Sequence, residues 1–257
     1  MPICLRFYAE LNDFLPRQRR DGPFLHDVPN GTAVKDVIEG LGVPHTEVDL
    51  VLVNGVSVPF SHRVAGGDRV SVYPVFEALE IATVTRVRPR PLRDPRFVLD
   101  VHLGRLARHL RLAGFDAEYR NDFADAELVE RAVADRRILL TRDRGVLKHT
   151  AVTHGYAVRS TVPADQFREV LRRFDLFGRV APFTRCLQCN FLLVETDATE
   201  VSSRIPPRVR ARHTTFRVCQ GCGRVYWAGT HHDRLSTFLR TALTEEPCDP
   251  AQISGSG

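Results

Sequence analysis

The chain has 257 residues, of which 26% are charged and 43% are hydrophobic. This balance is typical of a soluble globular protein and excludes a coiled-coil rod and a wholly disordered chain. The length predicts one to two domains. Because no stretch approaches 18 uninterrupted apolar residues, we expect no membrane span. The first residues lack the pattern of a secretion signal, so we expect a cytoplasmic protein whose cysteines are thiols or metal ligands.

The net charge is +5, and arginine supplies all but two of the 36 basic residues. Arginines gather in residues 86–96 and 201–217, which is compatible with binding to phosphate backbones and also with ordinary solvated surface charge. Residues 86–96, with the sequence RVRPRPLRDPR, also contain three prolines. Such a stretch is stiff and difficult to bury, so it predicts a linker.

The segment before this linker has the pattern of a small sheet with one helix. Thr32 is the expected N-cap of a helix over residues 33–41, where apolar residues recur at helical spacing. Asn54-Gly55 predicts a tight hairpin, because both positions of a type I′ turn require a positive φ. Strands are expected at residues 3–7, 24–28, 50–53, 56–58 and 69–73.

The stretches VLVNGVSVPF and VAGGDRVSVYPVF in this segment resemble the ubiquitin-like β-grasp domains of the sulfur carriers ThiS and MoaD. Sulfur carriers end in a free Gly-Gly carboxylate, whereas this chain continues through Val75-Phe76-Glu77. The resemblance therefore implies a structural or docking role rather than sulfur transfer. Docking onto an adenylating or sulfur-transfer enzyme is an alternative function for this domain.

The segment after the linker alternates strands with helices, which predicts a parallel sheet with helices on both faces. Gly114 is expected to end the first helix. The expected strands cover residues 97–100, 116–119 and 138–143, and the expected helices cover residues 102–112, 125–134 and 161–174.

Acidic residues follow two of these strands. Asp100 and Asp143 come at strand ends, and Asp125 stands at a helix start. The carboxyl ends of parallel strands share one edge of the sheet, and clustered carboxylates suit Mg²⁺ or Mn²⁺. Such a site activates water and stabilises charge on a phosphodiester. Each acid alone is equally well explained as the N-cap of a helix.

The run FVLDVHLGRLARHLRLAGFDAEYRNDFADAELVERAVADRRILLTRDRGVLK resembles the PIN-like ribonucleases, and most closely the Mut-7 C-terminal RNase family. Bacterial members of that family also carry an N-terminal ubiquitin-like domain and a C-terminal cysteine cluster. The resemblance implies that Asp100, Asp125 and Asp143 bind the catalytic metal. The acids of residues 122–127 align with the family in more than one way. In an alternative alignment, Glu127 or Asp122 replaces or supplements Asp125 as a metal ligand.

Four cysteines have the spacing of a metal site. Cys186 and Cys189 form one C-x-x-C pair, Cys219 and Cys222 form a second, and 29 residues lie between the pairs. Two such turns complete a tetrahedral zinc site with no open position, which predicts a structural zinc in an elaborated ribbon. A redox dithiol is the alternative. Cys4 and Cys248 have no partner at a useful spacing, which predicts plain thiols.

Aromatic and basic residues surround the second cysteine pair. Tyr226 and Trp227 are expected either to stack on bases or to pack in the core. His231 and His232 come at a helix start, where they are either solvated, in contact with phosphate or alternative metal ligands. The arginines expected to hold nucleic-acid phosphates are Arg105, Arg108, Arg142, Arg208, Arg210 and Arg212.

We therefore expect a multidomain protein of the α/β and α+β classes, with a β-grasp domain, a PIN-like parallel α/β sheet and a Cys4 zinc ribbon. The expected parts are residues 1–85, a linker at 86–96, residues 97–180, residues 181–245 and a tail at 246–257. The expected function is hydrolysis of RNA, in single-stranded form, with catalytic Mg²⁺ or Mn²⁺ and structural zinc. A non-catalytic RNA-binding adaptor is the alternative. The expected partners also include a protein bound by the β-grasp domain and, as in many PIN-like proteins, a second copy of the chain.

Overall fold

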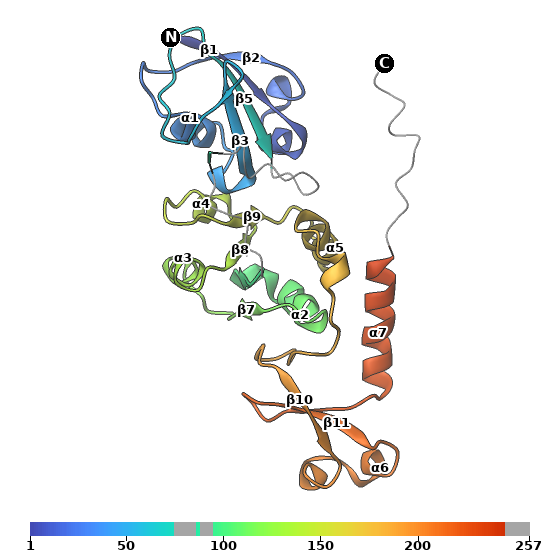
Figure 1. The fold of residues 1–257 in the computed structure, drawn as a ribbon. Helices are drawn as coiled ribbons and strands as arrows, with labels where there is room; N and C mark the ends of the chain where they lie inside the picture. Colours follow the sequence, from blue (N-terminus) through green and yellow to red (C-terminus); the bar gives the residue numbers. More distant parts are fainter. Residues whose placement is uncertain (75–85, 88–94, 245–257) are drawn as a thin grey trace. The chain divides into compact units, whose positions relative to one another are not determined.

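The computed structural model describes residues 1–74, 86–87 and 95–244 of the chain. Figure 1 shows their helices and strands. They belong to two compact units. Unit 1 consists of Met1–Ala107 and Asp116–Arg159, and unit 2 consists of Arg108–Phe115 and the chain from Ser160 onward. Most of the predicted linker, the predicted tail and Cys248 lie outside the described residues, so the domain limits stay predictions. None of the described helices is long and apolar enough to cross a membrane.

The N-terminal part of unit 1 is a β-grasp fold, as the sequence predicts. One helix, α1 (Val34–Gly40), buries Val34, Val37 and Ile38 in a hydrophobic core shared with the sheet. The strand order is β2-β1-β5-β3-β4, with β1 parallel to β5 and every other pairing antiparallel. The strands are β1 (Pro2–Phe7), β2 (Phe24–Asp27), β3 (Val48–Val53), β4 (Val56–Ser57) and β5 (Arg69–Pro74).

Two local predictions in this fold have opposite outcomes. Asn54 and Gly55 have φ values of 51° and 84° and join β3 to β4, so the hairpin is confirmed. The N-cap prediction for Thr32 is wrong, because Ala33 occupies the N-cap of α1 without a side-chain cap. The Thr32 hydroxyl instead donates to the carbonyl oxygen of Pro29, at 2.8 Å, and so closes the preceding turn.

The rest of unit 1 is a parallel sheet in the order β7-β6-β8-β9. Every residue of the central strands β6 and β8 is buried, as expected for a parallel sheet, and every residue of the edge strand β9 is buried as well. The sequence prediction missed β9, which consists of only Gly-Tyr-Ala and has neither alternation nor an apolar run. The strands are β6 (Phe97–Leu99), β7 (Ala117–Tyr119), β8 (Ile138–Thr141) and β9 (Gly155–Ala157).

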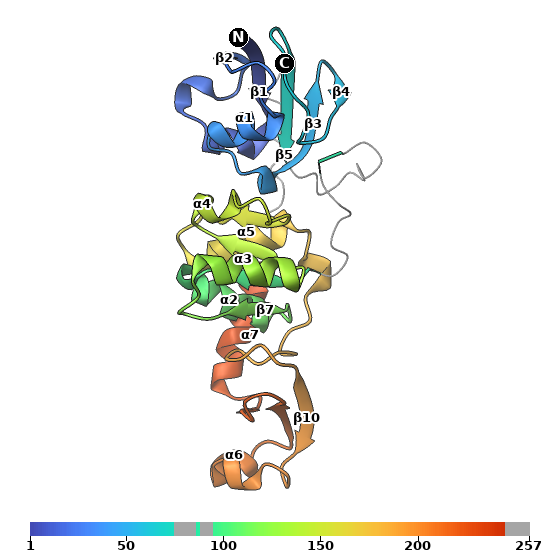
Figure 2. The same ribbon diagram turned by 90° about the vertical axis from the view of Figure 1, so that its left-hand side faces the viewer.

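The helices follow from this strand order. The chain moves from β6 to β7 through α2 (Gly104–Leu112) and then back across β6 to β8 through α3 (Asp125–Ala134). Connections between parallel strands are right-handed. Because the connection through α2 and the connection through α3 run in opposite directions along the sheet, the two helices lie on opposite faces. Figure 2 shows α3 lying across one face. The direction changes between β6 and β8, which makes their carboxyl ends the topological switch point of the sheet, where ligands of open α/β sheets bind.

Polar contacts join the β-grasp part of unit 1 to its parallel sheet. The buried carboxylate of Glu47 accepts a hydrogen bond from the amide of Ala157, at the end of β9, at 2.6 Å. His45 Nε2 donates to the carbonyl oxygen of Val152 at 2.8 Å. Lys148 Nζ donates to the carbonyl oxygen of Glu39 at 2.9 Å. These contacts, together with a hydrophobic core cluster that takes residues from both folds, hold the two folds in one compact unit.

Unit 2 contains a three-stranded antiparallel sheet in the order β10-β11-β12. Its small core consists of Val201, Ile205 and Phe216, with Trp227 packed against it. Pro163 opens α5 at its first turn, as predicted. The elements are α5 (Pro163–Arg173), β10 (Leu193–Asp197), α6 (Pro207–Arg210), β11 (Thr215–Cys219), β12 (Val225–Tyr226) and α7 (Thr230–Leu243).

Candidate functional site

Asp100 follows β6 at the switch point of the sheet and is 5% exposed. Its Oδ1 accepts a hydrogen bond from the amide of His102 at 2.8 Å. Its Oδ2 accepts bonds from the amide of Arg142, at 2.9 Å, and from the hydroxyl of Thr141. Donors therefore reach both oxygens of this buried carboxyl group and fix its orientation.

Asp143 lies two residues beyond β8 and is exposed. Its Oδ1 accepts from the amide of Gly145 at 2.7 Å and caps α4 (Arg144–Leu147). The Asp143 amide donates to the hydroxyl oxygen of Thr141 at 2.8 Å, and the same hydroxyl donates to Asp100. Thr141 thus links the two strand-end acids. The sequence prediction assigned Thr141 no role, although a hydroxyl at the end of a buried strand was a usable signal.

The third predicted acid belongs to a separate element. Asp125 is exposed in the first turn of α3, and Ala124 is the N-cap, so the alternative in which Asp125 caps this helix is wrong. Arg120 donates to Asp122 at 3.0 Å and to Glu127 at 2.8 Å. The Arg120 bond lowers the pKa of Asp122. Both neighbouring acids are therefore paired with a cation. Asp125 makes no side-chain hydrogen bond with any residue that the structure describes.

The three predicted acids do not form one ligand set in the part of the chain that the structure describes. Within residues 1–74, 86–87 and 95–244, the four cysteines are the one group of three or more His, Cys, Asp or Glu side chains placed to share an ion. The structure does link Asp100 to Asp143, through Thr141. The participation of Asp125 or Glu127 stays a prediction.

A cationic cavity of about 330 Å³ lies beside this edge of the sheet. Arg142 and Arg144, the neighbours of Asp143, line it together with Arg159, which pairs with Asp13 in the same lining at 3.4 Å. Phe14 of the β-grasp fold forms another wall, and the guanidinium groups of Arg144 and Arg159 lie 4.5 and 5.2 Å from the centre of its ring. The N-terminal fold therefore contributes to the surroundings of Asp143.

The other predicted arginines occupy several places. Arg105 is exposed on α2, and Arg208, Arg210 and Arg212 are exposed on or just after α6. Arg108 lines a second cavity, which belongs to unit 2. The binding of nucleic acid by these arginines stays a prediction.

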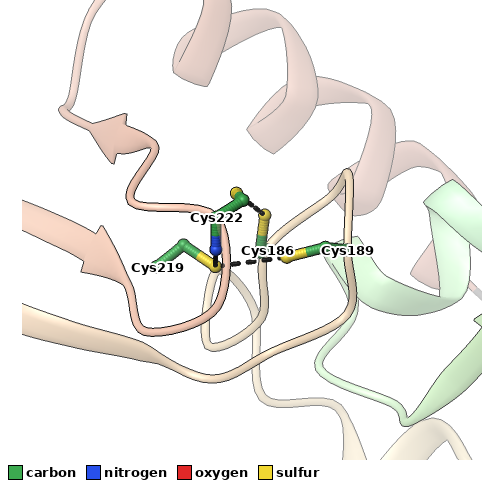
Figure 3. Close-up of side chains that lie close together, drawn as sticks. All are labelled: Cys186, Cys189, Cys219 and Cys222. Atoms are coloured by element: carbon green, nitrogen blue, oxygen red, sulfur yellow. Dashed lines mark hydrogen bonds between the residues drawn. The ribbon is translucent and has the colours of Figure 1, made fainter.

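The four predicted cysteines converge in unit 2, and their sulfur atoms all lie within 4.8 Å of one another (Figure 3). Cys186 Sγ lies 3.7 Å from Cys222 Sγ, and Cys189 Sγ lies 3.3 Å from Cys219 Sγ. The amides of Gly221 and Cys222 point at Cys219 Sγ from 3.4 Å, as Figure 3 shows for Cys222. This group can hold a metal ion.

Tyr226 supports this cluster, and its hydroxyl lies 3.1 Å from Cys186 Sγ. Burial raises the pKa of Cys186, but hydrogen bonds from Tyr226 and from neighbouring amides outweigh burial and bring the pKa to about 6. Burial and the surrounding thiols raise the pKa of Cys189 to about 12. One thiol of the group is thus readily ionised, as a metal ligand must be. Of the two alternatives for Tyr226, the structure shows packing, against the cysteines.

Comparison with known proteins decides the family. Residues 95–239, more than half of the chain, match the model of the Mut7-C RNAse domain. The chain belongs to the Mut7-C RNase family. Residues 1–80 match the model of the Mut7-C ubiquitin domain, in agreement with the β-grasp fold. Membership of this family indicates a nuclease-like function.

Two solved structures from Haloferax volcanii are similar to part of the Mut7-C chain. SAMP1 is 18% identical, with a TM-score of 0.25, and the match covers 31% of this chain and 100% of that one. A second structure, of small archaeal modifier protein 1, is 20% identical, with a TM-score of 0.24, and the match covers 29% and 98% of the two chains. A search of curated proteins found no match.

Proposed function

We propose that this Mut7-C protein is a metal-dependent ribonuclease whose catalytic site lies at the carboxyl ends of β6 and β8. The observation that carries the proposal is the link through Thr141 between Asp100 and Asp143, at the switch point of the sheet. A PIN-like nuclease needs acids at this place, and the family of the chain is named for its RNase domain. Asp125, or Glu127 in its place, completes the set.

The chemistry of these residues fits a hard divalent cation. Asp100 and Asp143 offer carboxylate oxygens, which Mg²⁺ and Mn²⁺ prefer. Each acid uses Oδ1 to cap the helical turn after its strand, and no hydrogen bond to Asp143 Oδ2 is seen among the described residues. Capping and metal binding are therefore compatible. When bound, the ion lowers the pKa of a coordinated water and stabilises negative charge on the phosphodiester.

The protein's own groups hold the acids and the substrate. The Thr141 hydroxyl and the Arg142 amide fix the carboxylate of Asp100, and the capping bond fixes that of Asp143. Asp125, with no hydrogen-bond partner in the described structure, is suited to orient the attacking water. The cations that hold the RNA backbone in the cavity beside Asp143 are Arg142 and Arg144.

The four cysteines hold a structural zinc in this proposal. Four thiolates fill a tetrahedral zinc site and leave no position for substrate. The short sulfur contacts, at 3.7 and 3.3 Å, each join one C-x-x-C pair to the other. That arrangement favours a shared ion over a redox dithiol, in which the two cysteines of one pair react with each other.

The test is cleavage of an end-labelled single-stranded RNA by the full zinc-loaded chain, with and without added Mn²⁺ or Mg²⁺. We expect shortened products only when a divalent ion is added. RNA binding without cleavage under any metal condition contradicts the proposal. That result favours the second candidate, an RNA-binding adaptor, for which the capping bonds of Asp100 and Asp143 are the supporting observation.

A further inference from the structure

A second cavity, of about 640 Å³, lies wholly within unit 2. Its walls come from β11, β12, the first turn of α7 and the segment around the first cysteine pair, and Arg108 of α2 closes one side. A cavity of this volume falls in the range of small-ligand sites. The nuclease proposal does not use it.

The lining of this cavity carries only positive charge. It includes four arginines and two histidines, and none of the lining residues that the structure describes is Asp or Glu. Arg108 and Arg224 are exposed, so their charge is available to a ligand. The arginines are Arg108, Arg185, Arg217 and Arg224, and the histidines are His231 and His232. Such a lining selects an anion, and guanidinium groups bind phosphate well.

Aromatic rings line the same cavity. His232 stacks on Phe183 with ring centres 4.2 Å apart, and Trp227 is half-buried in the wall. Flat rings of this kind stack on unpaired bases. A free phosphate or an acidic peptide would contact only the cationic side chains and would make no use of the rings. Rings and cations in one cavity therefore match both parts of a nucleotide.

The cavity also borders the cysteine cluster. Leu187 and Gln188, between the first two cysteines, line it, and Arg111 fixes their carbonyl oxygens at 3.3 and 2.8 Å. Tyr226 lines the cavity as well and reaches Cys186 with its hydroxyl. The metal site thus shapes one wall of the cavity.

We propose that this cavity binds an unpaired nucleotide of the RNA strand, with its base against Trp227 or the Phe183–His232 pair and its phosphate at Arg108 and Arg224. The inference rests on the proposed function for its choice of RNA. It goes beyond that function because it adds a strand-binding site, made from different residues, to the catalytic acids.

Trp227 provides a direct probe, because it is the one tryptophan of the chain. We would titrate the full zinc-loaded protein with oligouridylate, without added Mg²⁺ or Mn²⁺, and follow tryptophan fluorescence. We expect a saturable change. Arg108→Gln/Arg224→Gln should weaken binding at least about tenfold and flatten the slope of log K against log[salt] by about 1.4, or 0.7 for each lost contact. Arg240→Gln, on an exposed arginine of α7 outside the cavity, is the matched control.

Each outcome bears on the inference separately from the nuclease proposal. No saturable signal, or equal affinity and salt slope in the double variant and in the Arg240→Gln control, overturns the cavity site, even where the protein cleaves RNA. A signal lost in the double variant supports the site, even where no cleavage is detected. Polyglutamate that gives the same signal at the same affinity overturns the assignment to a nucleotide and points to an acidic peptide.

Discussion

The hydroxyl of Thr141 is fully buried and takes part in two hydrogen bonds, one as a donor to Asp100 and one as an acceptor from the amide of Asp143. The Asp100 carboxylate also accepts a hydrogen bond from the amide of Arg142, so Thr141 adds a second connection between the end of β6 and the residues after β8. The hydroxyl therefore fixes the position of Asp100 relative to Asp143. A side chain of the same shape without an oxygen would leave a buried carboxylate one donor short.

Thr141→Val tests this role. A lost hydrogen bond to a charged group costs about 1.5–3 kcal/mol, and we expect a loss of this size in the free energy of unfolding. The variant should also cleave RNA more slowly, because Asp100 loses a positioning bond. Urea denaturation and a cleavage assay measure the two effects. Thr141→Ser keeps the hydroxyl and is the control, and equal stability of all three proteins would show that the link is unimportant.

Glu47 offers a second residue-scale test, because it is fully buried and joins the β-grasp fold to β9. Its second oxygen lies 3.6 Å from Arg159. Glu47→Gln removes a buried charge opposite a partly exposed cation, so we expect a loss of about 3 kcal/mol in the free energy of unfolding. Glu130→Gln, on an exposed acid of α3, should have no measurable effect. Guanidinium denaturation measures the stability of both variants. An unchanged denaturation midpoint in Glu47→Gln refutes the prediction.

At the element scale, periodic segments were predictable and short or tertiary features were not. The strands of the β-grasp fold and helices α2, α3, α5 and α7 were predictable, because the spacing of apolar residues in the local sequence indicates strands and helices. Strand β9 has three residues and is buried only because its neighbours cover it. The caps proposed for Thr32 and Asp125 are wrong, because an acid or hydroxyl near a helix start occupies either the cap or the first turn.

In the candidate site too, features set by local sequence were predictable and features set by tertiary contacts were not. The placement of Asp100 and Asp143 at strand ends on one edge of the sheet follows from the strand boundaries and the parallel pattern, whereas the adjacency of β6 and β8 is seen only in the structure. The Thr141 link, the pairing of Glu127 with Arg120 and the Phe14 wall depend on contacts between segments far apart or on side-chain choice. Cysteine spacing predicted the cluster, because only a few residues separate the ligands within each pair.

Gly114, which ends α2, gives a test at this scale. Its φ is +95°, and an added Cβ would lie 2.3 Å from the carbonyl oxygen of Ala181. Gly114→Ala therefore combines backbone strain with a steric clash, and we expect it to lower the free energy of unfolding by at least about 2 kcal/mol. Gly178→Ala, where nothing lies within 4 Å, is the control. Thermal denaturation that finds the two variants equally stable would contradict this account of the helix end.

At the scale of the whole molecule, the two units depend on different chemistry. Unit 1 has two sheets and an extensive hydrophobic core, whereas the ribbon sheet of unit 2 packs around three buried side chains and a cysteine cluster. Small folds with little core commonly need a metal for stability. The proposed zinc therefore matters most for unit 2.

Cys219→Ser tests the zinc assignment. Elemental analysis should find about one zinc ion per chain in the unaltered protein and much less in the variant. Hydrogen exchange should then show faster exchange in β10 and β11, with β6 and β8 still protected. Cys4→Ser removes a thiol from β1, remote in sequence from the cluster, and should keep the full zinc content. Full zinc content in Cys219→Ser refutes the assignment.

The central claim is that the strand-end carboxylates catalyse metal-dependent cleavage of RNA. The most direct measurement compares Mn²⁺-dependent hydrolysis of an end-labelled single-stranded RNA by the unaltered protein, Asp143→Asn and the exposed-acid control Glu130→Gln. The proposed function predicts at least about a 100-fold loss of rate in Asp143→Asn, an unchanged rate in the control and the same zinc content in all three. An unchanged rate in Asp143→Asn would contradict the account and place the chemistry elsewhere in the chain.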